Sequence, residues 1–397
     1  MRVQPVLALS LTCTMCLTSV AVAQEATFGA QVRPRTEYRD PVGGDDDAFT
    51  SMRVRAHVDA MLKRDVRVFV ELQDVRIWGE ESSTLADFEA DNFDLHQGFI
   101  ELASTNKRLM ARFGRQEMNV GGQRRVGAVD WTQQGRAFDG IRAYAGGGWG
   151  GVTLFGYQLS DATSPAVPND GEFIGAVGEV KNVAGGTLEL YALYDHVEAT
   201  LANTNQGTLG ARLAGERSGV IYRGELYIQT GDRAGVDVAA FMLGARAGTR
   251  FADGKGQVTA WYDYLSGDDD PADGKTKVFS TLFATNHKFY GFADLFLDIP
   301  AHTAGLGLQD IVLKGSYALR DDLTLAADLH SFHLAKQGLL STKHLGEELD
   351  LTSSYRYSPN LSFTGGLSYV FAADAFSEIG RLGENMTWVY IMLNAAF

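Results

Sequence analysis

Hydrophobic and polar side chains alternate over most of the chain. In the last segment, Leu393 and Val389 fall on one face, whereas Asn394 and Tyr390 fall on the other. Successive side chains of a β-strand point to opposite sides, so this pattern predicts strands with one apolar face. The chain ends in Phe397 directly after this alternation, which is typical of the last strand of an outer-membrane β-barrel, although a strand that closes a soluble sandwich also alternates.

Alternation and turn residues together predict about 18 strands, an even number such as bacterial single-chain barrels have. The predicted strands are residues 26–39, 49–62, 66–78, 93–103, 108–117, 137–146, 149–160, 171–182, 186–197, 206–215, 218–231, 237–251, 256–266, 305–319, 322–334, 345–357, 360–372 and 386–397.

Short and long connections between these strands are expected to follow one another in strict order. Tight connections come after even-numbered strands, as at 63–65, 147–148 and 320–321. Long ones come after odd-numbered strands, for example 40–48, 79–92, 118–136, 161–170 and 267–304. A soluble sandwich has no reason to sort its loops onto one end. The predicted fold class is therefore all-β, a transmembrane antiparallel β-barrel with short periplasmic turns and long extracellular loops.

The segment 292–299 also has a strand-like pattern. Counting it as a strand would make the total odd and break the order of turns, which disagrees with the even counts of bacterial barrels. We therefore assign it to the long loop 267–304, which is a candidate plug for the lumen.

The start of the chain predicts export. Arg2, an apolar stretch and a small-residue site at 21–23 indicate a signal peptide over residues 1–23, with the barrel occupying 24–397. Cys13 and Cys16 both lie in that peptide, so the mature chain is expected to have no thiol for disulfides, metal sites or nucleophilic catalysis. No later run reaches the roughly 20 apolar residues that a spanning helix needs. Localisation in the outer membrane of a Gram-negative cell follows.

Composition and charge agree with this class. The 45 glycines, 15 tyrosines and 22 phenylalanines beside 8 prolines describe a strand-rich chain with many turns and aromatic anchors. The formal net charge of -14 becomes -15 once Arg2 is removed, since 34 basic then oppose 49 acidic residues. An acidic chain of this kind lacks the basic surface that nucleic-acid binding requires.

Strand alternation assigns an inner and an outer face. Placing a charge on the lipid face would cost about 2–4 kcal/mol near the midplane, so charged faces are assigned to the lumen. The arginines assigned there are Arg33, Arg35, Arg39, Arg53, Arg55, Arg67, Arg112, Arg142, Arg212, Arg223, Arg246, Arg250 and Arg356. Carboxylates are interleaved with them, namely Glu37, Glu71, Glu101, Glu225, Asp263 and Asp350.

Two interpretations of these arginines remain open. Pairs of arginine and carboxylate commonly brace the wall of a wide barrel and have no part in transport. Alternatively, the guanidinium groups form a series of weak sites along which an anionic solute can move. An exposed pair is worth only about 0–1 kcal/mol, which suits passage better than tight binding.

The long loops predict a strongly acidic external rim. Asp45, Asp46, Asp47, Glu80, Glu81, Asp87, Glu89, Asp91, Asp268, Asp269 and Asp270 make up this predicted rim. A solvated, repulsive rim is one interpretation, and divalent-cation bridging to lipopolysaccharide or to an emerging acidic polymer is the other. Asp268, Asp269 and Asp270 are weak metal candidates, because Pro271 interrupts the spacing that a calcium loop requires.

Several motifs of the chain resemble those of the alginate export family of outer-membrane barrels. They are Phe113-Gly114-Arg115-Gln116-Glu117-Met118, Gln123-Arg124-Arg125-Val126-Gly127, Gln134-Gly135-Arg136-Ala137-Phe138-Asp139-Gly140-Ile141-Arg142 and residues 261–296. The resemblance implies a monomeric barrel that passes acidic polysaccharide outward and is gated by loops at both mouths. It also makes Arg115, Arg124, Arg125, Arg136 and Arg142 candidates for a constriction, with the loop 118–136 folding inward.

The predicted function is an outer-membrane channel for anionic solutes, with acidic polysaccharide export as the leading interpretation. A diffusion porin for small anions and a structural barrel with a plugged lumen are the alternatives. Expected partners are lipid, lipopolysaccharide, the solute and periplasmic export proteins, and no cofactor is expected. No catalytic arrangement is legible among the eight histidines, and His330 and His333 fall on opposite strand faces.

Overall fold

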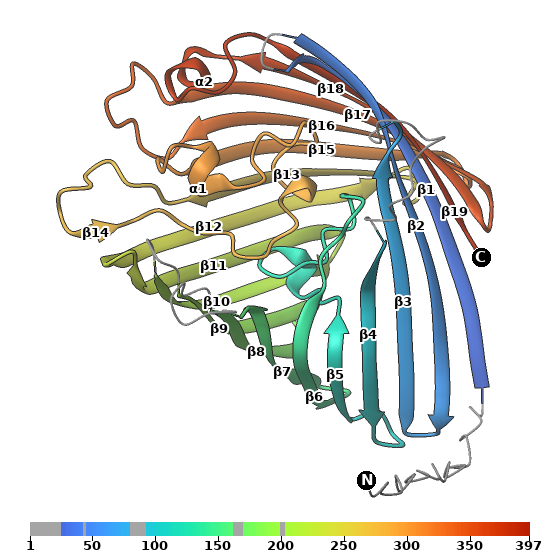
Figure 1. Ribbon diagram of the computed structural model, residues 1–397. Helices are drawn as coiled ribbons and strands as arrows, with labels where there is room; N and C mark the ends of the chain where they lie inside the picture. Colours follow the sequence, from blue (N-terminus) through green and yellow to red (C-terminus); the bar gives the residue numbers. More distant parts are fainter. Residues whose placement is uncertain (1–24, 43–44, 80–92, 162–169, 199–202) are drawn as a thin grey trace, which may run out of the picture.

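The computed structural model describes residues 25–42, 45–79, 93–161, 170–198 and 203–397 (Figure 1). The predicted signal peptide, with Cys13 and Cys16, lies outside the described residues. So do five acidic positions of the predicted rim, namely Glu80, Glu81, Asp87, Glu89 and Asp91.

A single antiparallel sheet closes on itself to form the barrel, because β1 pairs with both β2 and β19. Its eighteen wall strands are β1 (Glu25–Val42), β2 (Asp45–Lys63), β3 (Val66–Ile77), β4 (Phe93–Ala103), β5 (Leu109–Gln116), β6 (Phe138–Gly147), β7 (Gly150–Ser160), β8 (Gly171–Val183), β9 (Gly186–Val197), β10 (Thr204–Arg217), β11 (Val220–Arg233), β12 (Val236–Phe251), β13 (Gly256–Leu265), β15 (Leu308–Arg320), β16 (Leu323–Leu334), β17 (His344–Ser358), β18 (Leu361–Ala372) and β19 (Met386–Ala396).

The predicted strands are confirmed, with ends that differ by a few residues. The segment 292–299 is not a strand, also as predicted: it leads into the short helix α1 (Ile299–His302), which Asp298 caps. The remaining elements are β14 (Lys275–Thr276), which pairs in parallel with β12, the helix α2 (Asp374–Glu378), and the 3-10 turns η1 (Gly121–Gln123) and η2 (Asn286–Lys288).

Two of the connections predicted to be long are in fact short. The ladder between β1 and β2 continues to the pair Val42 and Asp45, so most of the predicted loop 40–48 is strand. Ala234 and Gly235 join β11 to β12 with positive φ at both positions, which closes an antiparallel pair in a tight turn. In both places backbone pairing continues past the predicted end of the strand, because polar side chains do not by themselves stop a ladder.

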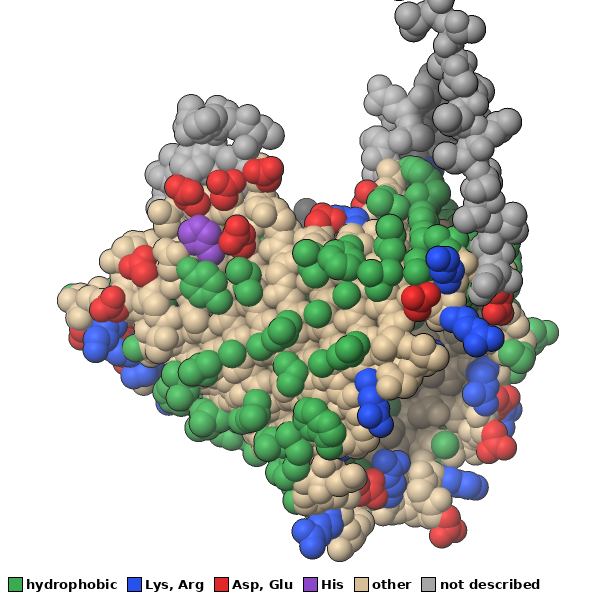
Figure 2. Space-filling model, turned by 90° about the horizontal axis from the view of Figure 1, so that it is seen from below, with side chains coloured by type: hydrophobic (Ala, Val, Ile, Leu, Met, Phe, Trp, Pro, Cys, Tyr) green, Lys and Arg blue, Asp and Glu red, His purple; other side chains and the backbone are tan. Residues whose placement is uncertain are grey.

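The outer wall is apolar and the inner wall is charged, as the alternation predicts. Leu209 on β10 and Leu154 on β7 are more than half exposed, whereas Arg33 and Arg53 are almost fully buried. Figure 2 shows rows of hydrophobic side chains across the outer wall, with charged side chains at its margins and around a hollow on one side. No helix in the described part of the chain is both long and apolar enough to cross a membrane.

Two connections fold into the ring of strands (Figure 1). The first inward loop, residues 117–137, joins β5 to β6, and the second inward loop, residues 277–306, joins β13 to β15. They meet backbone to backbone: the Gly127 N–H donates to the Phe283 carbonyl at 2.8 Å, and the Phe283 N–H donates to the Arg125 carbonyl at 3.0 Å. The predicted inward folding of 118–136 is therefore confirmed, and it brings the two loops into one layer across the lumen.

Candidate functional site

Four arginines of β1 and β2 hold the first inward loop against the wall. Arg33 donates to the Asp130 carbonyl at 2.7 Å, and Arg35 donates to the Trp131 carbonyl at 2.7 Å. Arg53 donates to the Asp130 carboxylate at 2.9 Å, and Arg55 to the Gln134 carbonyl at 3.4 Å. All four side chains are buried between the wall and the loop, and together they fix the loop in place. These contacts also explain why the loop turns inward, since its carbonyls find donors there.

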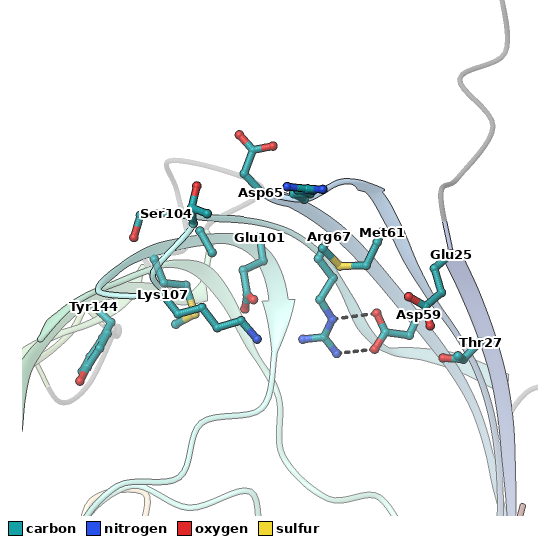
Figure 3. A pocket seen from close by; sticks show the side chains of 14 residues that line it. Glu25, Thr27, Asp59, Met61, Asp65, Arg67, Glu101, Ser104, Lys107 and Tyr144 are labelled. Carbon is teal, nitrogen blue, oxygen red and sulfur yellow. Dashed lines mark hydrogen bonds and ion pairs between the residues drawn. The ribbon is translucent and has the colours of Figure 1, made fainter. Parts of the chain in front are cut away.

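Arg67 and Arg112 lie near the turn end of the lumen and pair with wall carboxylates. Arg67 makes two bonds to Asp59, at 2.7 and 2.8 Å, and Arg112 donates to Glu101 at 2.9 Å. Figure 3 shows Asp59, Arg67 and Glu101 together around a cavity of about 550 Å³. This mouth therefore presents both signs of charge, with the arginine and carboxylate pairs side by side.

A second cavity, of about 540 Å³, lies at the other end of the same strands. Arg115 lies on its edge and pairs with Asp139 at 2.8 Å. The lining residues include Gln73, Val75, His96, Gln134 and Gly135. Because β3 contributes Arg67 to the first cavity and Gln73 to the second, the two cavities mark the inner surface along β3 and β4 on either side of the clamped loop.

Arg124, from the first inward loop, enters a buried cluster of four charges. Its Nε lies 2.9 Å from Glu225 and its Nη2 lies 2.5 Å from Asp263. Arg223 pairs with the same two carboxylates, at 3.1 and 2.6 Å. Burial alone would lower the pKa of Arg124, but the two carboxylates outweigh it and raise the pKa well above the ordinary value. The loop is thus fastened to β11 and β13 by charge as well as to β1 and β2.

Arg125 and Arg136 have no ion-pair partner among the described residues. The Arg125 guanidinium lies 4.4 Å from the Tyr227 ring and 4.9 Å from the Phe279 ring, and it contacts the Met242 sulfur. Arg136 donates to the Phe283 carbonyl at 2.5 Å, and burial lowers its pKa. Both arginines therefore join the two inward loops to each other or to the wall through rings and carbonyls.

Arg142 on β6, Arg246 on β12 and Lys288 in the second inward loop are further lumen cations without a carboxylate partner in the described part of the chain. Arg142 and Arg246 are partly exposed and Lys288 is exposed. Although the residue is exposed as a whole, its ammonium is partly desolvated, and this, together with the nearby Arg212 and Arg124, lowers the pKa of Lys288. Strand alternation in the sequence predicted the two arginines but not Lys288, because Lys288 lies in a loop that has no strand periodicity.

The predicted site residues therefore divide into two groups. Of the eleven predicted arginines, eight pair with carboxylates, namely Arg33, Arg35, Arg53, Arg55, Arg67, Arg112, Arg115 and Arg124. The other three are Arg125, Arg136 and Arg142. The bracing interpretation describes the contacts of the first group, and the interpretation as a solute track depends on cations outside it.

Two of the three weak metal candidates of the loop 267–304 lie close to lysines, and the third, Asp270, accepts a hydrogen bond from the Ala272 N–H. Asp269 lies 3.1 Å from Lys336, and Asp268 lies 4.0 Å from Lys277. Within the described ranges, side chains of metal-ligating type converge elsewhere, at Asp328, His330 and Asp350. Asp328 and His330 are two positions apart on one strand, so strand periodicity puts them on the same face, and it puts Asp350 on the inner face of the next strand. This is the sequence signal that would have found the group.

Residues 24–389 match the family model described as alginate export. The chain belongs to the alginate export family. Among curated protein sequences, none is significantly similar to it. The match spans all the described strands except the last residues of β19, so family membership concerns the whole barrel.

Solved structures show the same architecture at low identity. Pseudomonas aeruginosa OpdO has a TM-score of 0.65 at 12% identity and covers 94% of this chain and 98% of its own. Acinetobacter baumannii OccAB4 has a TM-score of 0.66 at 9% identity, with coverages of 95% and 99%. Pseudomonas aeruginosa OccK2 in complex with glucuronate has a TM-score of 0.61 at 14% identity, with coverages of 94% and 98%. At these identities the likeness shows the fold alone, a closed antiparallel β-barrel of 18 strands.

Proposed function

We propose that this channel passes acidic sugars, whose carboxylates are drawn through the lumen by cationic side chains. Export of an acidic polysaccharide such as alginate is the leading function, because the family is described as alginate export. Guanidinium and ammonium groups suit this substrate, since they bind carboxylates but hold each exposed one only weakly.

A difference between cations and carboxylates in the lumen carries this proposal. Arg142, Arg246 and Lys288 are at least partly exposed and have no carboxylate partner in the described ranges. By contrast, Glu348 and Asp350 are almost fully buried and accept hydrogen bonds from the backbone of the second inward loop. A passing anion therefore meets open positive charges, whereas these carboxylates are covered.

Uptake of small acidic sugars is a second candidate. The two inward loops form a layer across the lumen, which favours solutes small enough to pass beside it. A structural relative, OccK2, was solved with glucuronate, a single acidic sugar. Polymer and monomer carry the same carboxylate, so the cations support both candidates and the size of the opening separates them.

Planar-bilayer recording of the refolded protein tests the proposal. The wild-type channel should be anion-selective, and the triple variant Arg142→Gln, Arg246→Gln, Lys288→Gln should lose much of that selectivity because three uncompensated positive charges are removed. A matched control, Arg67→Gln with Asp59→Asn, removes a neutral pair from the same lumen and should leave the reversal potential nearly unchanged.

The solute added to the bath distinguishes the candidates. Block by long uronate chains supports export, whereas indifference to them together with permeation of glucuronate supports small-anion uptake. Equal reversal potentials in the triple variant and the wild type would reject the three cations as the filter. Absence of any conductance until the second inward loop is deleted would reject both candidates in favour of a plugged barrel.

A further inference from the structure

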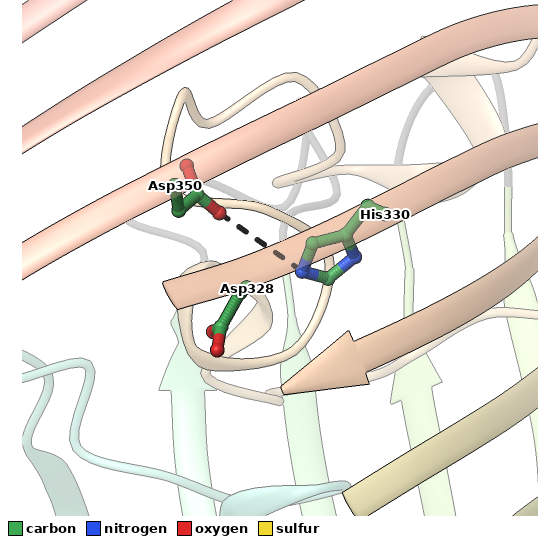
Figure 4. Close-up of side chains that lie close together, drawn as sticks. All are labelled: Asp328, His330 and Asp350. Carbon is green, nitrogen blue, oxygen red and sulfur yellow. Dashed lines mark ion pairs between the residues drawn. The ribbon is translucent and has the colours of Figure 1, made fainter. Parts of the chain in front are cut away.

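Asp328, His330 and Asp350 form a cluster on the inner wall of β16 and β17 that the proposed function does not use. One ligand atom from each lies within 4.8 Å of the others. Figure 4 shows the three side chains close together, with the Asp350 carboxylate directed toward the His330 ring. We infer that this cluster is a binding site for a divalent transition-metal ion such as Zn²⁺.

The ring of His330 is oriented as a metal ligand would be. Its Nδ1 lies 3.0 Å from an oxygen of Asp310, and its Nε2 lies on the side of Asp350, 4.0 Å from that carboxylate. A carboxylate that accepts the Nδ1 proton fixes the tautomer in which Nε2 carries the free lone pair. Hydrogen bonding of this kind is the usual support of a metal-bound histidine, and here Asp310 supplies it.

Asp350 is fixed from two sides. Its Oδ1 accepts a hydrogen bond from the Ser368 hydroxyl, and its Oδ2 accepts one from the Phe292 N–H at 3.3 Å. These donors leave lone pairs of Oδ2 directed toward His330. Because Phe292 belongs to the second inward loop, an ion held by Asp350 would also be joined to that loop.

The surrounding wall holds more carboxylates than the cations that pair with them, so it has room for an additional positive charge. Six carboxylates line this connected, buried region, namely Glu225, Asp263, Asp310, Asp328, Glu348 and Asp350. Arg124, Arg223 and Lys314 pair with them, and the Arg125 guanidinium is also close enough to act on Glu225. Isolated charges are costly to bury, so the excess must be neutralised by protons or by an ion. The fully buried Glu348 also has one oxygen, Oε2, without a hydrogen-bond partner among the described atoms.

Lys314 currently supplies a positive charge at the same place. Its Nζ lies 2.6 Å from Asp328 and 3.4 Å from His330 Nε2. In the same position the ammonium lies 5.1 Å from the centroid of the Trp261 ring, and the lysine stem is long, flexible and partly exposed, so the ammonium can give way to a bound ion. Metal binding and the lysine are therefore expected to compete for Asp328 and His330.

The ligand set indicates the class of ion. One imidazole nitrogen with two carboxylates suits Zn²⁺ and neighbouring first-row ions, which bind such ligands at about 2.0–2.2 Å. Ca²⁺ and Mg²⁺ favour sites made of oxygen alone. Small rotations of the two aspartates would bring their oxygens from the present spacing to those distances.

Calorimetric titration of the refolded full-length barrel with Zn²⁺, after treatment with a chelator, tests this inference. The wild type should bind one ion, and His330→Gln should weaken binding by roughly tenfold or more. Lys314→Met should tighten it, because the competing ammonium is gone. His344→Ala is the matched control, since His344 lies on the rim beside Glu347 and should not alter the Kd.

X-ray absorption of the zinc-loaded protein should show one imidazole and oxygen ligands. If His330→Gln does not fold, Asp328→Asn replaces it, because Asp328 is the least buried of the three ligands. Unchanged Zn²⁺ affinity in either variant would overturn the inference. Equal affinity of Lys314→Met and wild type would overturn it as well, and would leave the cluster as an ion-pair network around the lysine.

Discussion

Trp131 and His287 stack face to face, with ring centroids 4.1 Å apart and planes inclined by 6°. Trp131 belongs to the first inward loop and His287 to the second, so this stack joins two segments that are far apart in the sequence. The Arg35 guanidinium covers the Trp131 ring at 4.0 Å, and His287 pairs with Asp294 at 2.6 Å. The two inward loops are therefore joined to each other by aromatic contact, which continues to Trp388 and Tyr390 of β19, and by charge beside it.

Replacing Trp131 by alanine should loosen the two loops while the barrel wall stays closed. An aromatic pair contributes about 0.5–1.5 kcal/mol beyond its buried area, and the strand ladder does not involve this ring. We expect higher single-channel conductance and faster proteolysis within the inward loops. The control Trp149→Ala removes an exposed indole at a turn and should change neither quantity. Conductance equal to that of the wild type would show that the stack does not hold the layer.

Replacing Arg124 by methionine should strongly destabilise the protein. The change leaves Glu225 and Asp263 buried with Arg223 as the nearest cation, and breaking a buried ion pair costs about 3–5 kcal/mol. Arg115→Met, which breaks a much more exposed pair with Asp139, should cost only about 0–1 kcal/mol. Urea unfolding in detergent measures both free energies. Similar losses in the two variants would mean that the buried cluster contributes no more than a surface pair.

Anion selectivity should fall as the pH rises, and this fall should occur at a lower pH than the titration of an ordinary lysine would give. The pKa of Lys288 is lowered from 10.5 by burial and by Arg212 and Arg124, so its positive charge is present below this lowered pKa and is lost as the pH rises through it. Reversal potentials recorded from about pH 7 to about pH 10 follow this loss, since arginine stays charged throughout. The Lys288→Met channel should lack this pH dependence. If the Lys288→Met channel has the same pH profile as the wild type, the pH dependence belongs to another group.

An arginine on the outer wall should impair folding in lipid. Leu209 on β10 is 66% exposed on the apolar face, and a charge there would cost about 2–4 kcal/mol if it lies near the bilayer midplane. Asp253→Arg, in an exposed turn between β12 and β13, should cost much less. The folded fraction in lipid vesicles measures both. Equal folding of Leu209→Arg and wild type would contradict the assignment of this face to lipid.

The barrel itself could be predicted from the sequence because its signals are local. Strand alternation has a period of two, and the turn residues lie next to the strands that they join. Thus Arg33 and Arg53 could be placed inside and Val32 outside without any knowledge of tertiary contacts. The ends of β1 and β11 were predicted less well, since a ladder continues wherever both strands supply backbone partners.

The state of the lumen side chains could not be predicted in the same way. Alternation places Arg55 and Arg246 on inward strand faces, and Arg124 lies in a predicted loop. Neither assignment says which carboxylate reaches each arginine. Arg124 meets Asp263 across 139 positions of sequence, and Arg33 meets Gln133 across 100. No periodic signal connects residues at such separations.

The sequence alone therefore determined the number of strands, their faces and the inward direction of the arginines, because each depends on neighbouring residues. Only the tertiary structure decided which arginines clamp the first inward loop and which stay open. It also decided that Val126 and Phe283 pair and that His330 meets Asp350. The physical reason is that burial and charge pairing in a closed barrel depend on what lies across the lumen, and closure brings distant strands and loops to the same place.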